Sequence, residues 1–534
     1  MKKTKYIIIT GGVMSGLGKG ILTVSIGKLL QAQGYTVAPL KIDPYLNIDA
    51  GTMNPVEHGE VFVLDDGGEV DMDLGNYERF LNISLSRKNN LTTGKIYKHV
   101  IDKERKGDYL GKTVQIVPHI TCAIQNWITS LGEKTDFVLV EVGGTVGDIE
   151  SIPFLEAMRE LSTTENVYFA HLALVPTLSV VGEQKTKPVQ HSVRTLGEIG
   201  IKPNLLVCRC DRPLNKKTKK KIALFCGVKE DEIISDHDAN IYEVPLILKE
   251  QHIAEMILDS FNMKHNGSKL EDWKSFVSNL KDTDKKVTIA MTGKYTELHD
   301  SYISIKEALN HASANFRCDV EVKFIETTDI EKNETTAEET LKDIDALIVP
   351  GGFGSRGTEG KIKCINYARK NNMPFLGLCL GFQLACIEFA RNVCNIKDAA
   401  STEINPNTTH PIIDIMENQK KIVCKGGTMR LGAYPATLKK GSAVEKLYKT
   451  ANVSERHRHR YEVNNSYKAE LESHGLIFSG TSPDKMLMEF LELPSHPYFI
   501  GTQAHPELKS KPLKPHPLFL GLVNAAIEVR KQKA

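Results

Sequence analysis

Thr10-Gly-Gly-Val-Met-Ser-Gly-Leu-Gly-Lys-Gly20 follows an apolar run at Tyr6–Ile9 and precedes a helical pattern over about Ile21–Gln33. A strand, a glycine-rich bend and a helix in this order form a cradle for anions, because loop N–H groups and the helix N-terminus both face the bound group. Lys19 is placed to contact the outer phosphates of a nucleotide. The stretch therefore predicts an α/β domain with a nucleotide-binding loop.

This loop departs from the standard P-loop pattern at two positions. Val13 stands where the pattern has its first glycine, and Gly20 replaces the Ser or Thr that would hold Mg²⁺. A purely structural glycine turn is the alternative interpretation. We favour a nucleotide loop of deviant type, whose magnesium ligands come from elsewhere in the chain.

The composition limits the class of protein. The chain has 534 residues, enough for two or three domains, and a net charge of +2 that indicates neither nucleic acid nor a membrane surface as partner. Its ten cysteines are scattered without a CxxC pair, which is typical of a reducing, intracellular setting. No stretch approaches membrane-spanning length, and the first apolar run is too short for a signal peptide. We expect a cytoplasmic enzyme.

Acidic and basic residues at the ends of predicted strands are the next candidates. Lys41 and Asp43 lie at the carboxyl end of a strand predicted over Tyr35–Ile42, the edge where open α/β sheets bind ligands. Asp136–Glu141 has the pattern of a buried strand that ends in an acid, as in the Walker B arrangement. Asp65–Asp73 is predicted as a turn with five acids. We predict Asp73 and Glu141 as the Mg²⁺ ligands; a solvated acidic loop is the alternative for the turn.

The composition shifts near the middle of the chain. From about Asn262 to Lys286 it is rich in Asn, Gly, Ser, Lys and Asp, with Trp273 as an isolated aromatic anchor, which indicates a linker with some helix. A new strand follows at Val287–Met291, and alternating strands and helices continue from there. We therefore divide the chain into domains at 1–265 and 287–534, joined by a linker at 266–286.

A cysteine motif is the main feature of the second domain. In Pro374-Phe-Leu-Gly-Leu-Cys-Leu-Gly-Phe-Gln383, a strand is followed by Gly377-x-Cys379-x-Gly381 and then by a helix. This is the pattern of a nucleophile elbow with sulfur in place of oxygen. The helix N-terminus favours the thiolate, so Cys379 is the candidate nucleophile. Buried, inert packing is the expectation for the other nine cysteines.

A candidate base lies near the C-terminus. Ala504-His-Pro-Glu507 provides His505 with an orienting carboxylate, Glu507, two residues further on. The basic run Glu455–Arg460 would, on composition alone, be predicted on the surface.

Several ordered motifs together resemble the CTP synthase family. They are TGGVMSGLGKG, KIDPYLNIDAGTM, HGEVFVLDDGGEVDMDLGNYERF, GDYLGKTVQIVPHIT, VEVGGTVGDIES and GEQKTKPVQHSV, followed by the glutaminase motifs. The resemblance implies an N-terminal P-loop-like, doubly wound parallel sheet (the amidoligase, or synthase, domain) and a C-terminal class I glutamine amidotransferase α/β domain. It implies that UTP, ATP and glutamine yield CTP, ADP, phosphate and glutamate. Inhibition by CTP, activation by GTP and a homotetramer are also implied, with no role for nucleic acid or membrane.

The resemblance also implies roles for individual residues. Cys379, His505 and Glu507 would form the glutaminase triad, with Gly351, Gly352 and the backbone of Leu380 as the oxyanion hole. Lys19 and Lys41 would neutralise charge during phosphoryl transfer. The implied ATP contacts are Gly16, Leu17, Gly18, Lys19, Gly20, Ile21, Asp73, His237, Asp238 and Ala239. The implied UTP and CTP contacts are Ser15, Asp148, Ile149, Glu150, Lys185, Thr186, Lys187, Pro188, Val189, Gln190 and Lys221. The implied glutamine contacts are Gly352, Leu380, Gly381, Phe382, Gln383, Glu403 and Arg460.

The resemblance places the basic run Glu455–Arg460 between the glutaminase site and an effector site for GTP. Further candidates for that effector site are Lys294, Tyr295, Arg356 and Arg430. Ala504 and Leu508 stand where the family usually has aromatic residues, which we interpret as altered packing around an intact base.

Two other functions fit parts of the sequence. Another P-loop ligase with a glutaminase, such as a cobyrinic acid amidase, shares the phosphate loop and the cysteine elbow. It should lack the Lys185–Gln190 string and the basic run Glu455–Arg460. A partitioning-type ATPase would explain the first loop alone and would leave Cys379, His505 and Glu507 without a purpose.

Overall fold

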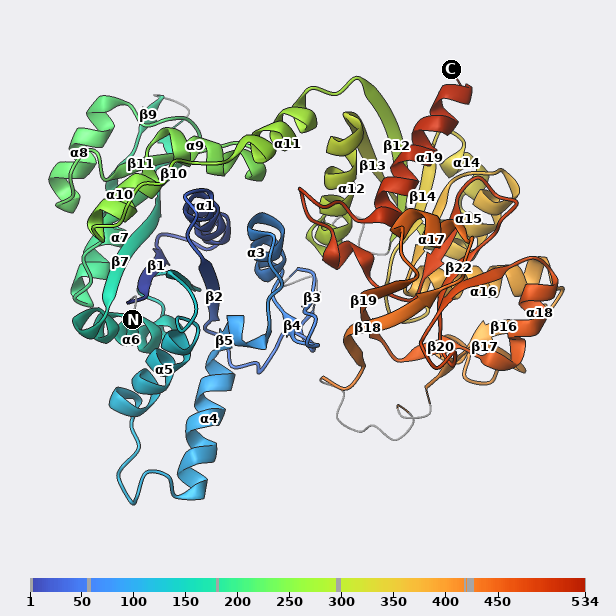
Figure 1. The fold of residues 1–534 in the computed structure, drawn as a ribbon, viewed down its shortest axis with the longest axis horizontal. Helices are drawn as coiled ribbons and strands as arrows, with labels where there is room; N and C mark the ends of the chain where they lie inside the picture. The colour runs from blue at the N-terminus through green and yellow to red at the C-terminus, as the bar shows by residue number, and fades with distance from the viewer. Residues whose placement is uncertain are drawn as a thin grey trace. The chain divides into compact units, whose positions relative to one another are not determined.

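The computed structural model of the chain describes residues 3–54, 59–178, 182–293, 299–416, 419 and 427–533. It forms two compact units (Figure 1). The first comprises Met1–Ala50 and Asn76–Lys274, and the second comprises Gly51–Gly75 and Ser275–Ala534. The segment Gly51–Gly75 therefore clusters with the C-terminal part of the chain, although the predicted domain boundaries, which stay a proposal, place it in the first domain.

The first unit is built on a parallel sheet in the order β11-β10-β7-β1-β6-β2-β5. Its strands are β1 (Lys5–Gly11), β2 (Val37–Asp43), β5 (Asn90–Thr92), β6 (Phe137–Val142), β7 (Asn166–Leu174), β10 (Leu205–Cys210) and β11 (Ile233–His237). A separate small hairpin pairs β8 (Thr177–Leu178) with β9 (Glu183–Gln184). Strand β1 lies between β6 and β7, so the loops after these three strands emerge at the same edge of the sheet.

Helices cover both faces of this sheet, which explains the continuous apolar runs of its strands. Ile8 packs with α4, α5 and α6 on one face. On the other face α1 approaches so closely that a Cβ on Gly27 would lie 2.7 Å from Leu139. The helices are α1 (Lys19–Ala32), α4 (Thr93–Lys106), α5 (Thr121–Ser130), α6 (Ile152–Thr164), α7 (Lys187–Glu198), α8 (Lys216–Cys226), α9 (Val244–Glu250) and α10 (Ile253–Ser260).

The second unit contains a mixed sheet in the order β13-β12-β14-β15-β23-β22-β21-β18-β19. The pairs from β13 to β23 are parallel, and those from β23 to β19 are antiparallel. The strands are β12 (Lys285–Gly293), β13 (Cys318–Glu326), β14 (Ala346–Val349), β15 (Phe375–Leu378), β18 (Arg430–Leu438), β19 (Asn452–His459), β21 (Ile477–Thr481), β22 (Met488–Glu492) and β23 (Phe499–Thr502). A smaller sheet joins β16 (Ala399–Ser401), β17 (His410–Ile415) and β20 (Tyr461–Val463).

Two apolar cores lie against this mixed sheet, one built around α15 and α16 and the other around α12 and α19. The helices of the unit are α12 (Ile303–Phe316), α13 (Thr327–Glu331), α14 (Ala337–Leu341), α15 (Thr358–Lys370), α16 (Leu380–Asn392), α17 (Ala443–Tyr448), α18 (Lys468–Ser473) and α19 (Pro517–Lys533). The hairpin of β3 (Phe62–Val63) and β4 (Glu69–Val70) also belongs to this unit.

The predicted α/β class is confirmed, and local boundaries differ in three places. Helix α1 begins at Lys19, two residues before the predicted start. The predicted acidic turn contains β4 and ends at the first residue of α3 (Asp73–Leu81). The predicted linker contains α11 (Glu271–Lys281), on which Trp273 is 1% exposed and donates from Nε1 to the carbonyl of Tyr242 at 2.8 Å.

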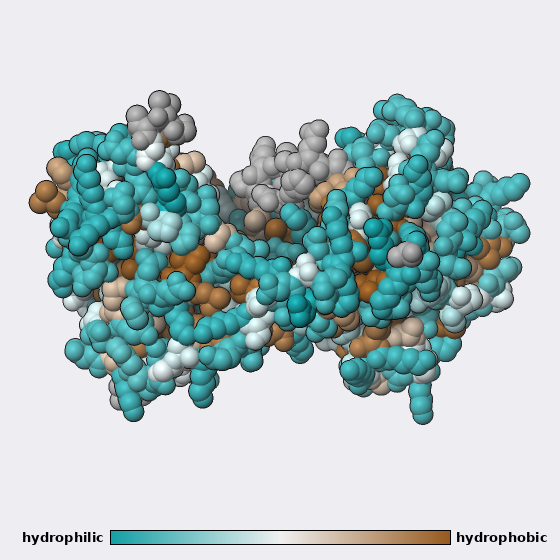
Figure 2. Space-filling model, turned by 90° about the horizontal axis from the view of Figure 1, so that it is seen from above, coloured by the Kyte–Doolittle hydropathy of each residue, from teal (hydrophilic) through white to brown (hydrophobic). Residues whose placement is uncertain are grey.

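On the face seen in Figure 2, hydrophilic residues cover most of each unit and hydrophobic residues are exposed only in scattered patches. Among the described residues, we find no helix of sufficient length and hydrophobicity to span a membrane.

Candidate active sites

The glycine-rich loop between β1 and α1 has the backbone of an anion cradle. Gly16 and Gly18 have positive φ angles of 74° and 98°, and Gly18 precedes the first residue of α1. Val13 also has a positive φ, 81°, which is strained for a β-branched residue and which the glycine of a standard loop would adopt freely. Lys19 opens the helix and donates from Nζ to the carbonyl of Gly144 at 2.6 Å. The loop thus presents N–H groups and an ammonium at the carboxyl edge of the sheet.

A buried histidine supports this loop from below. His171 on β7 is fully buried, with Nδ1 2.8 Å from Oγ1 of Thr10 and Nε2 2.7 Å from Oγ of Ser192. Burial, and secondarily the charge of Lys19, lowers the pKa of His171 to about 3. Gly12 lies directly above, where a Cβ would lie 1.5 Å from the same Ser192 oxygen. A neutral imidazole therefore links two hydroxyl groups under the phosphate loop.

Carboxylates and a lysine gather at the ends of β2 and β6. Glu141 is 1% exposed and accepts hydrogen bonds from Nζ of Lys41, at 2.7 Å, and from the hydroxyl of Tyr77. Nζ of Lys41 also lies 3.9 Å from Oδ1 of Asp43. These carboxylate oxygens are of the type that Mg²⁺ prefers, so Glu141 fits the predicted role. The second predicted ligand, Asp73, begins α3 in a segment that clusters with the other unit.

The cysteine elbow lies in the second unit. Cys379 follows β15 and precedes α16, and its backbone has φ 49° and ψ −99°, an unusual conformation for a residue other than glycine. The neighbouring glycine is required, because a Cβ on Gly381 would lie 2.0 Å from the carbonyl oxygen of Val349. The turn presents the Cys379 sulfur near the side-chain nitrogen of Gln503, at 3.7 Å. Backbone strain of this kind is found at nucleophile elbows.

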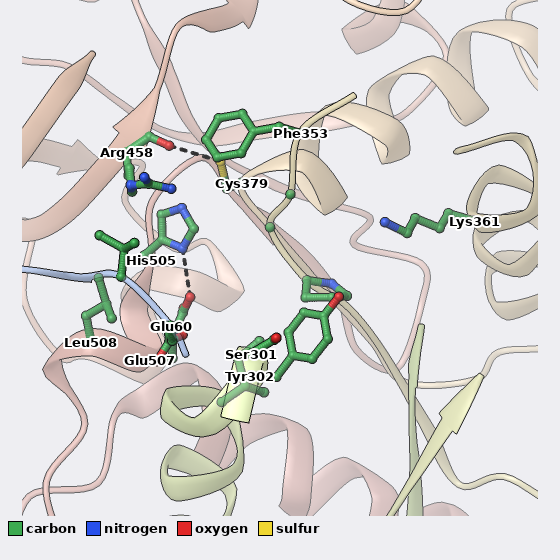
Figure 3. A pocket seen from close by; sticks show the side chains of 15 residues that line it. Glu60, Ser301, Tyr302, Phe353, Lys361, Cys379, Arg458, His505, Glu507 and Leu508 are labelled. Atoms are coloured by element: carbon green, nitrogen blue, oxygen red, sulfur yellow. Dashed lines mark hydrogen bonds and ion pairs between the residues drawn. The ribbon is translucent and has the colours of Figure 1, made fainter. Parts of the chain in front are cut away.

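His505 and Glu507 complete a triad with this cysteine. Nδ1 of His505 lies 2.7 Å from Oε1 of Glu507, which is 3% exposed. Burial disfavours the imidazolium, but Glu507 and then Cys379 raise the pKa of His505 well above its usual value. A Cβ on Gly351 would lie only 2.7 Å from Cε1 of His505, so a glycine at this position leaves room for the imidazole beside Cys379. Figure 3 shows the imidazole between the sulfur and the carboxylate.

The triad opens into a cavity of about 220 Å³. Several of its lining residues were not predicted from the sequence: Glu60, Val61, Ser301, Tyr302, Phe353, Lys361 and Arg458 (Figure 3). Of these, Arg458 belongs to the basic run that we had placed near the site. For the others the sequence gives no local signal, because they come from four separate parts of the chain: Glu60 with Val61, Ser301 with Tyr302, Phe353, and Lys361.

The predicted glutamine contacts lie around the elbow with varied roles. Phe382 is fully buried in the core. Gln383 donates to the carbonyl of Tyr461 at 2.9 Å, and Glu403 accepts from the N–H of Gly354 at 2.9 Å. Arg460 donates to Oε1 of Gln419 at 2.5 Å and to the hydroxyl of Thr428 at 3.0 Å. Leu380 and Gly381 are the first residues of α16, and Gly352 lines the cavity.

Comparison with known proteins matches both units. Residues 5–263 match the family model described as CTP synthase N-terminus, and residues 297–525 match Glutamine amidotransferase class-I. A CTP synthase of Methanopyrus kandleri is 53% identical over 529 residues, which is 98% of this chain and 99% of that protein. A CTP synthase of Pyrococcus abyssi is 54% identical over 535 residues, 99% of each.

The chain belongs to the CTP synthase family. Among solved structures, the glutaminase domain of Trypanosoma brucei CTPS with bound acivicin is 36% identical to it. That match covers 45% of this chain and 94% of the other, with a TM-score of 0.43.

In this CTP synthase family member, the candidate ATP and UTP residues lie on several loops of the first unit. Asp148 accepts from the N–H of Thr145 at 2.6 Å, and Ile149 is 81% exposed. The remaining candidates of this unit that are exposed to solvent are Ser15, Gly16, Glu150, Lys187, Lys221, Asp238 and Ala239, whereas Asp148 and Pro188 are half-buried. Leu17 and Gly20 are buried, whereas Gly18, Lys19, Ile21 and His237 are half-buried. Asp238 forms an ion pair with Arg209 at 2.7 Å.

The string after β9 forms the start of α7. Thr186 is 4% exposed and accepts from Nε2 of Gln190 at 2.9 Å, and Nζ of Lys185 lies 2.6 Å from Glu183. Lys187 lies over the ring of Phe225, at 5.9 Å from its centroid. Val189 is fully buried in the core, so its side chain has a packing role.

The surface prediction for the basic run is wrong. The run forms most of β19, and Arg456, His457 and His459 are each at most 2% exposed. Composition misleads here because Arg456 is paired with Asp65, and because burial lowers the pKa of His457 and of His459 well below the usual value, so that both are neutral. Arg430, a candidate for the GTP site, is likewise buried and donates to Glu462 at 3.1 Å and to Glu489 at 2.6 Å. Arg430 also lines a pocket together with Gln419, Thr428 and Tyr434, and its role at a GTP site stays a prediction.

The remaining candidates for the GTP site are Arg356, Lys294 and Tyr295. Arg356 is exposed, whereas Lys294 and Tyr295 lie outside the described residues.

Among the other described cysteines, Cys122 is exposed, which corrects the expectation that all are buried. Cys386 is typical of the rest, since burial raises the pKa of its thiol.

Proposed function

We propose that the chain makes CTP by amination of UTP, with ATP as phosphoryl donor and glutamine as nitrogen source. The observation that carries this proposal is the presence of two different machineries on one chain. One is the phosphate loop with Lys19, and the other is the triad of Cys379, His505 and Glu507. Neither a lone ATPase nor a lone glutaminase needs both.

The triad hydrolyses glutamine. The sulfur of Cys379 attacks the side-chain carboxamide carbon, and the C–N bond breaks as ammonia leaves with a proton from His505. Glu507 holds the imidazole through Nδ1, at 2.7 Å, so that Nε2 faces the nucleophile and leaving group. The N–H groups of Gly352 and Leu380 are proposed to receive the developing oxyanion. Water then hydrolyses the thioester and releases glutamate.

The synthase site activates UTP. The 4-oxygen of UTP is a poor leaving group, so its attack on the γ-phosphorus of ATP forms a phosphorylated intermediate and ADP. Ammonia then adds at C4 and phosphate leaves, which gives CTP. Lys19 and Lys41 are proposed to neutralise charge on the transferring phosphoryl group, because phosphoryl transfer depends mainly on positioning and electrostatics.

Asp73 and Glu141 would hold Mg²⁺, which when bound neutralises phosphate charge. The candidate nucleotide contacts given above, from Ser15 to Lys221 for UTP and CTP and from Gly16 to Ala239 for ATP, belong to this proposal. Inhibition by CTP, activation by GTP and assembly into a homotetramer rest on the family alone. Sedimentation that gives a monomer with ATP and UTP saturating would count against the tetramer.

The direct test is an incubation with UTP, ATP, Mg²⁺ and glutamine, followed by chromatography for CTP. We expect CTP and glutamate to form in equal amounts. Glutamate without CTP, under conditions where ATP and UTP bind, would contradict the synthase assignment.

A further inference from the structure

The segment Gly51–Gly75 separates from its sequence neighbours. It connects β2 and α3 in sequence, yet it clusters with the unit that carries the glutaminase triad. Within it, β3 and β4 pair antiparallel through Phe62 with Val70 and Val63 with Glu69. We call Phe62–Val70 the β3–β4 hairpin.

Two acidic side chains attach this hairpin to strand β19. Oδ1 of Asp65 accepts from Nε of Arg456 at 2.6 Å, and Oε1 of Glu69 accepts from Nε of Arg458 at 2.9 Å. Arg456 and Glu69 have side chains that are 1% exposed, so each pair includes a deeply buried charge. Hydrogen bonds between ionised partners in such surroundings are stronger than neutral ones. Arg458 also donates to the carbonyl of Gly51 at 3.2 Å.

The backbone of the hairpin is fitted to β18 as well. The N–H of Ala433 donates to the carbonyl of Asp65 at 2.9 Å. The preceding Gly432 has φ 97°, and a Cβ there would lie 2.6 Å from the nitrogen of Gly67. A side chain at this position would therefore push the hairpin away. The contact of the hairpin with β18 and β19 thus combines a backbone hydrogen bond, a close approach at Gly432 and two ion pairs.

The arginines that hold the hairpin also belong to the glutaminase site. The carbonyl of Arg456 accepts from the N–H of His505 at 2.8 Å, and the carbonyl of Arg458 lies 4.0 Å from the sulfur of Cys379. Just before the hairpin, Glu60 accepts from the N–H of Ser304 at 3.0 Å and lines the triad cavity. A displacement of the hairpin would therefore move the strand that positions both the base and the nucleophile.

After the hairpin, the chain continues to a proposed residue of the synthase site. Asp73, the proposed Mg²⁺ ligand, follows Val70 by three residues and begins α3, and the boundary between the two units falls inside this helix. We propose that Asp65 and Glu69 are positioning residues of the glutaminase, which make glutamine hydrolysis depend on nucleotide and Mg²⁺ at the synthase site. This inference rests on the proposed function.

The test measures glutamate release by the full-length protein, with and without UTP, Mg²⁺ and an ATP analogue with a methylene bridge between the β- and γ-phosphates. The analogue fills the site without allowing phosphoryl transfer, so occupancy is separated from turnover. In the wild type we expect nucleotides to raise the rate of hydrolysis by about fivefold or more, the lower end of typical coupling between sites.

Three variants break the hairpin contact in different ways. Asp65→Asn and Glu69→Gln remove one charge each, and Gly432→Ala displaces the backbone without changing any charge. We expect the ratio of the glutamine hydrolysis rates with and without nucleotides to fall towards one in all three variants. CTP formation from added ammonia should stay near the wild-type rate. Asp65→Glu keeps the carboxylate and should retain the ratio.

The matched control is Glu359→Gln, which breaks the ion pair between Glu359 and Arg391, at 2.8 Å, elsewhere in the same unit. It should behave as the wild type. The inference would be overturned if the ratio is unchanged in Asp65→Asn and Glu69→Gln. It would also be overturned if the control loses the ratio equally, or if the wild type itself has a ratio of one. Absence of CTP from the wild type with both glutamine and ammonia would instead refute the proposed function itself. Thermal melts confirm that the variants compared are folded.

Discussion

Nζ of Lys41 lies 2.7 Å from Oε1 of Glu141, and the two side chains are 8% and 2% exposed. The pair joins neighbouring strands β2 and β6 at the edge where a parallel sheet binds its ligands. A carboxylate at this edge is suited to bind a metal ion, and an ammonium is suited to bind a phosphate. While the two groups are buried, each needs the opposite charge of the other to offset its loss of hydration. The consequences of separating them can be measured.

Lys41→Met should destabilise the protein by about 3–5 kcal/mol, because it leaves the carboxylate of Glu141 buried without its cation. The double variant Lys41→Met/Glu141→Gln removes both charges and should recover most of this loss. Urea unfolding of the wild type and both variants measures the effect. A double variant as unstable as the single one would show that the pair is not the source of the loss.

Asp73→Asn and Glu141→Gln should each shift the Mg²⁺ dependence of CTP formation to higher concentration, since an amide is a poorer ligand than a carboxylate. The measurement is a Mg²⁺ titration at fixed ATP and UTP, with Asp102→Asn, an exposed acid on α4, as the control. If both variants titrate as the wild type does, the ligand pair is wrong and Asp66 and Asp71 of the same acidic turn become the candidates.

Lys19→Ala should abolish CTP formation with either glutamine or ammonia, because phosphoryl transfer precedes attack by either nitrogen source. Glutamine hydrolysis should persist in part, since the triad does not use this lysine. Parallel assays of glutamate and CTP test the expectation. Synthesis from ammonia at the wild-type rate would remove Lys19 from the phosphoryl-transfer site.

The buried His171 predicts acid sensitivity of the phosphate-loop unit. Its folded pKa of about 3 lies below the usual 6.5, so the unfolded chain binds the extra proton. The stability that the neutral imidazole contributes is complete above about pH 6.5 and is lost as the pH falls towards 3. His171→Gln cannot take up this proton, so its unfolding midpoint should fall less steeply with acid. The exposed His474→Gln is the control; equal slopes in all three proteins would contradict the assignment.

The phosphate loop and the cysteine elbow could be predicted from the sequence because both depend on local backbone geometry. Gly16 and Gly18 have positive φ angles in the turn between β1 and α1, and Gly381, at the start of α16, leaves no room for a Cβ. A short pattern carries this information. The family resemblance then supplied the candidate roles of single residues, which geometry alone does not assign.

The wall of the glutaminase cavity could not be predicted in this way. Glu60 reaches it only because the segment Gly51–Gly75 packs on β18 and β19, nearly four hundred positions later in the sequence. The burial of Arg456 has the same origin, since its partner Asp65 comes from that hairpin. Pairing between residues so far apart in sequence leaves no periodic pattern in either segment. From composition alone, a charged run such as Glu455–Arg460 is therefore predicted to lie on the surface.

The division of labour between the two machineries is tested most directly by Cys379→Ala. Without the sulfur no thioester forms, and loss of a triad nucleophile costs on the order of 10⁶ in rate, so glutamine-dependent CTP formation should become undetectable. The phosphate loop and Lys19 belong to the other unit and should be unaffected. The decisive measurement is CTP formation by this variant with added ammonium salt at raised pH. We predict a rate near that of the wild type; equal loss of the ammonia-dependent and glutamine-dependent activities would contradict the account.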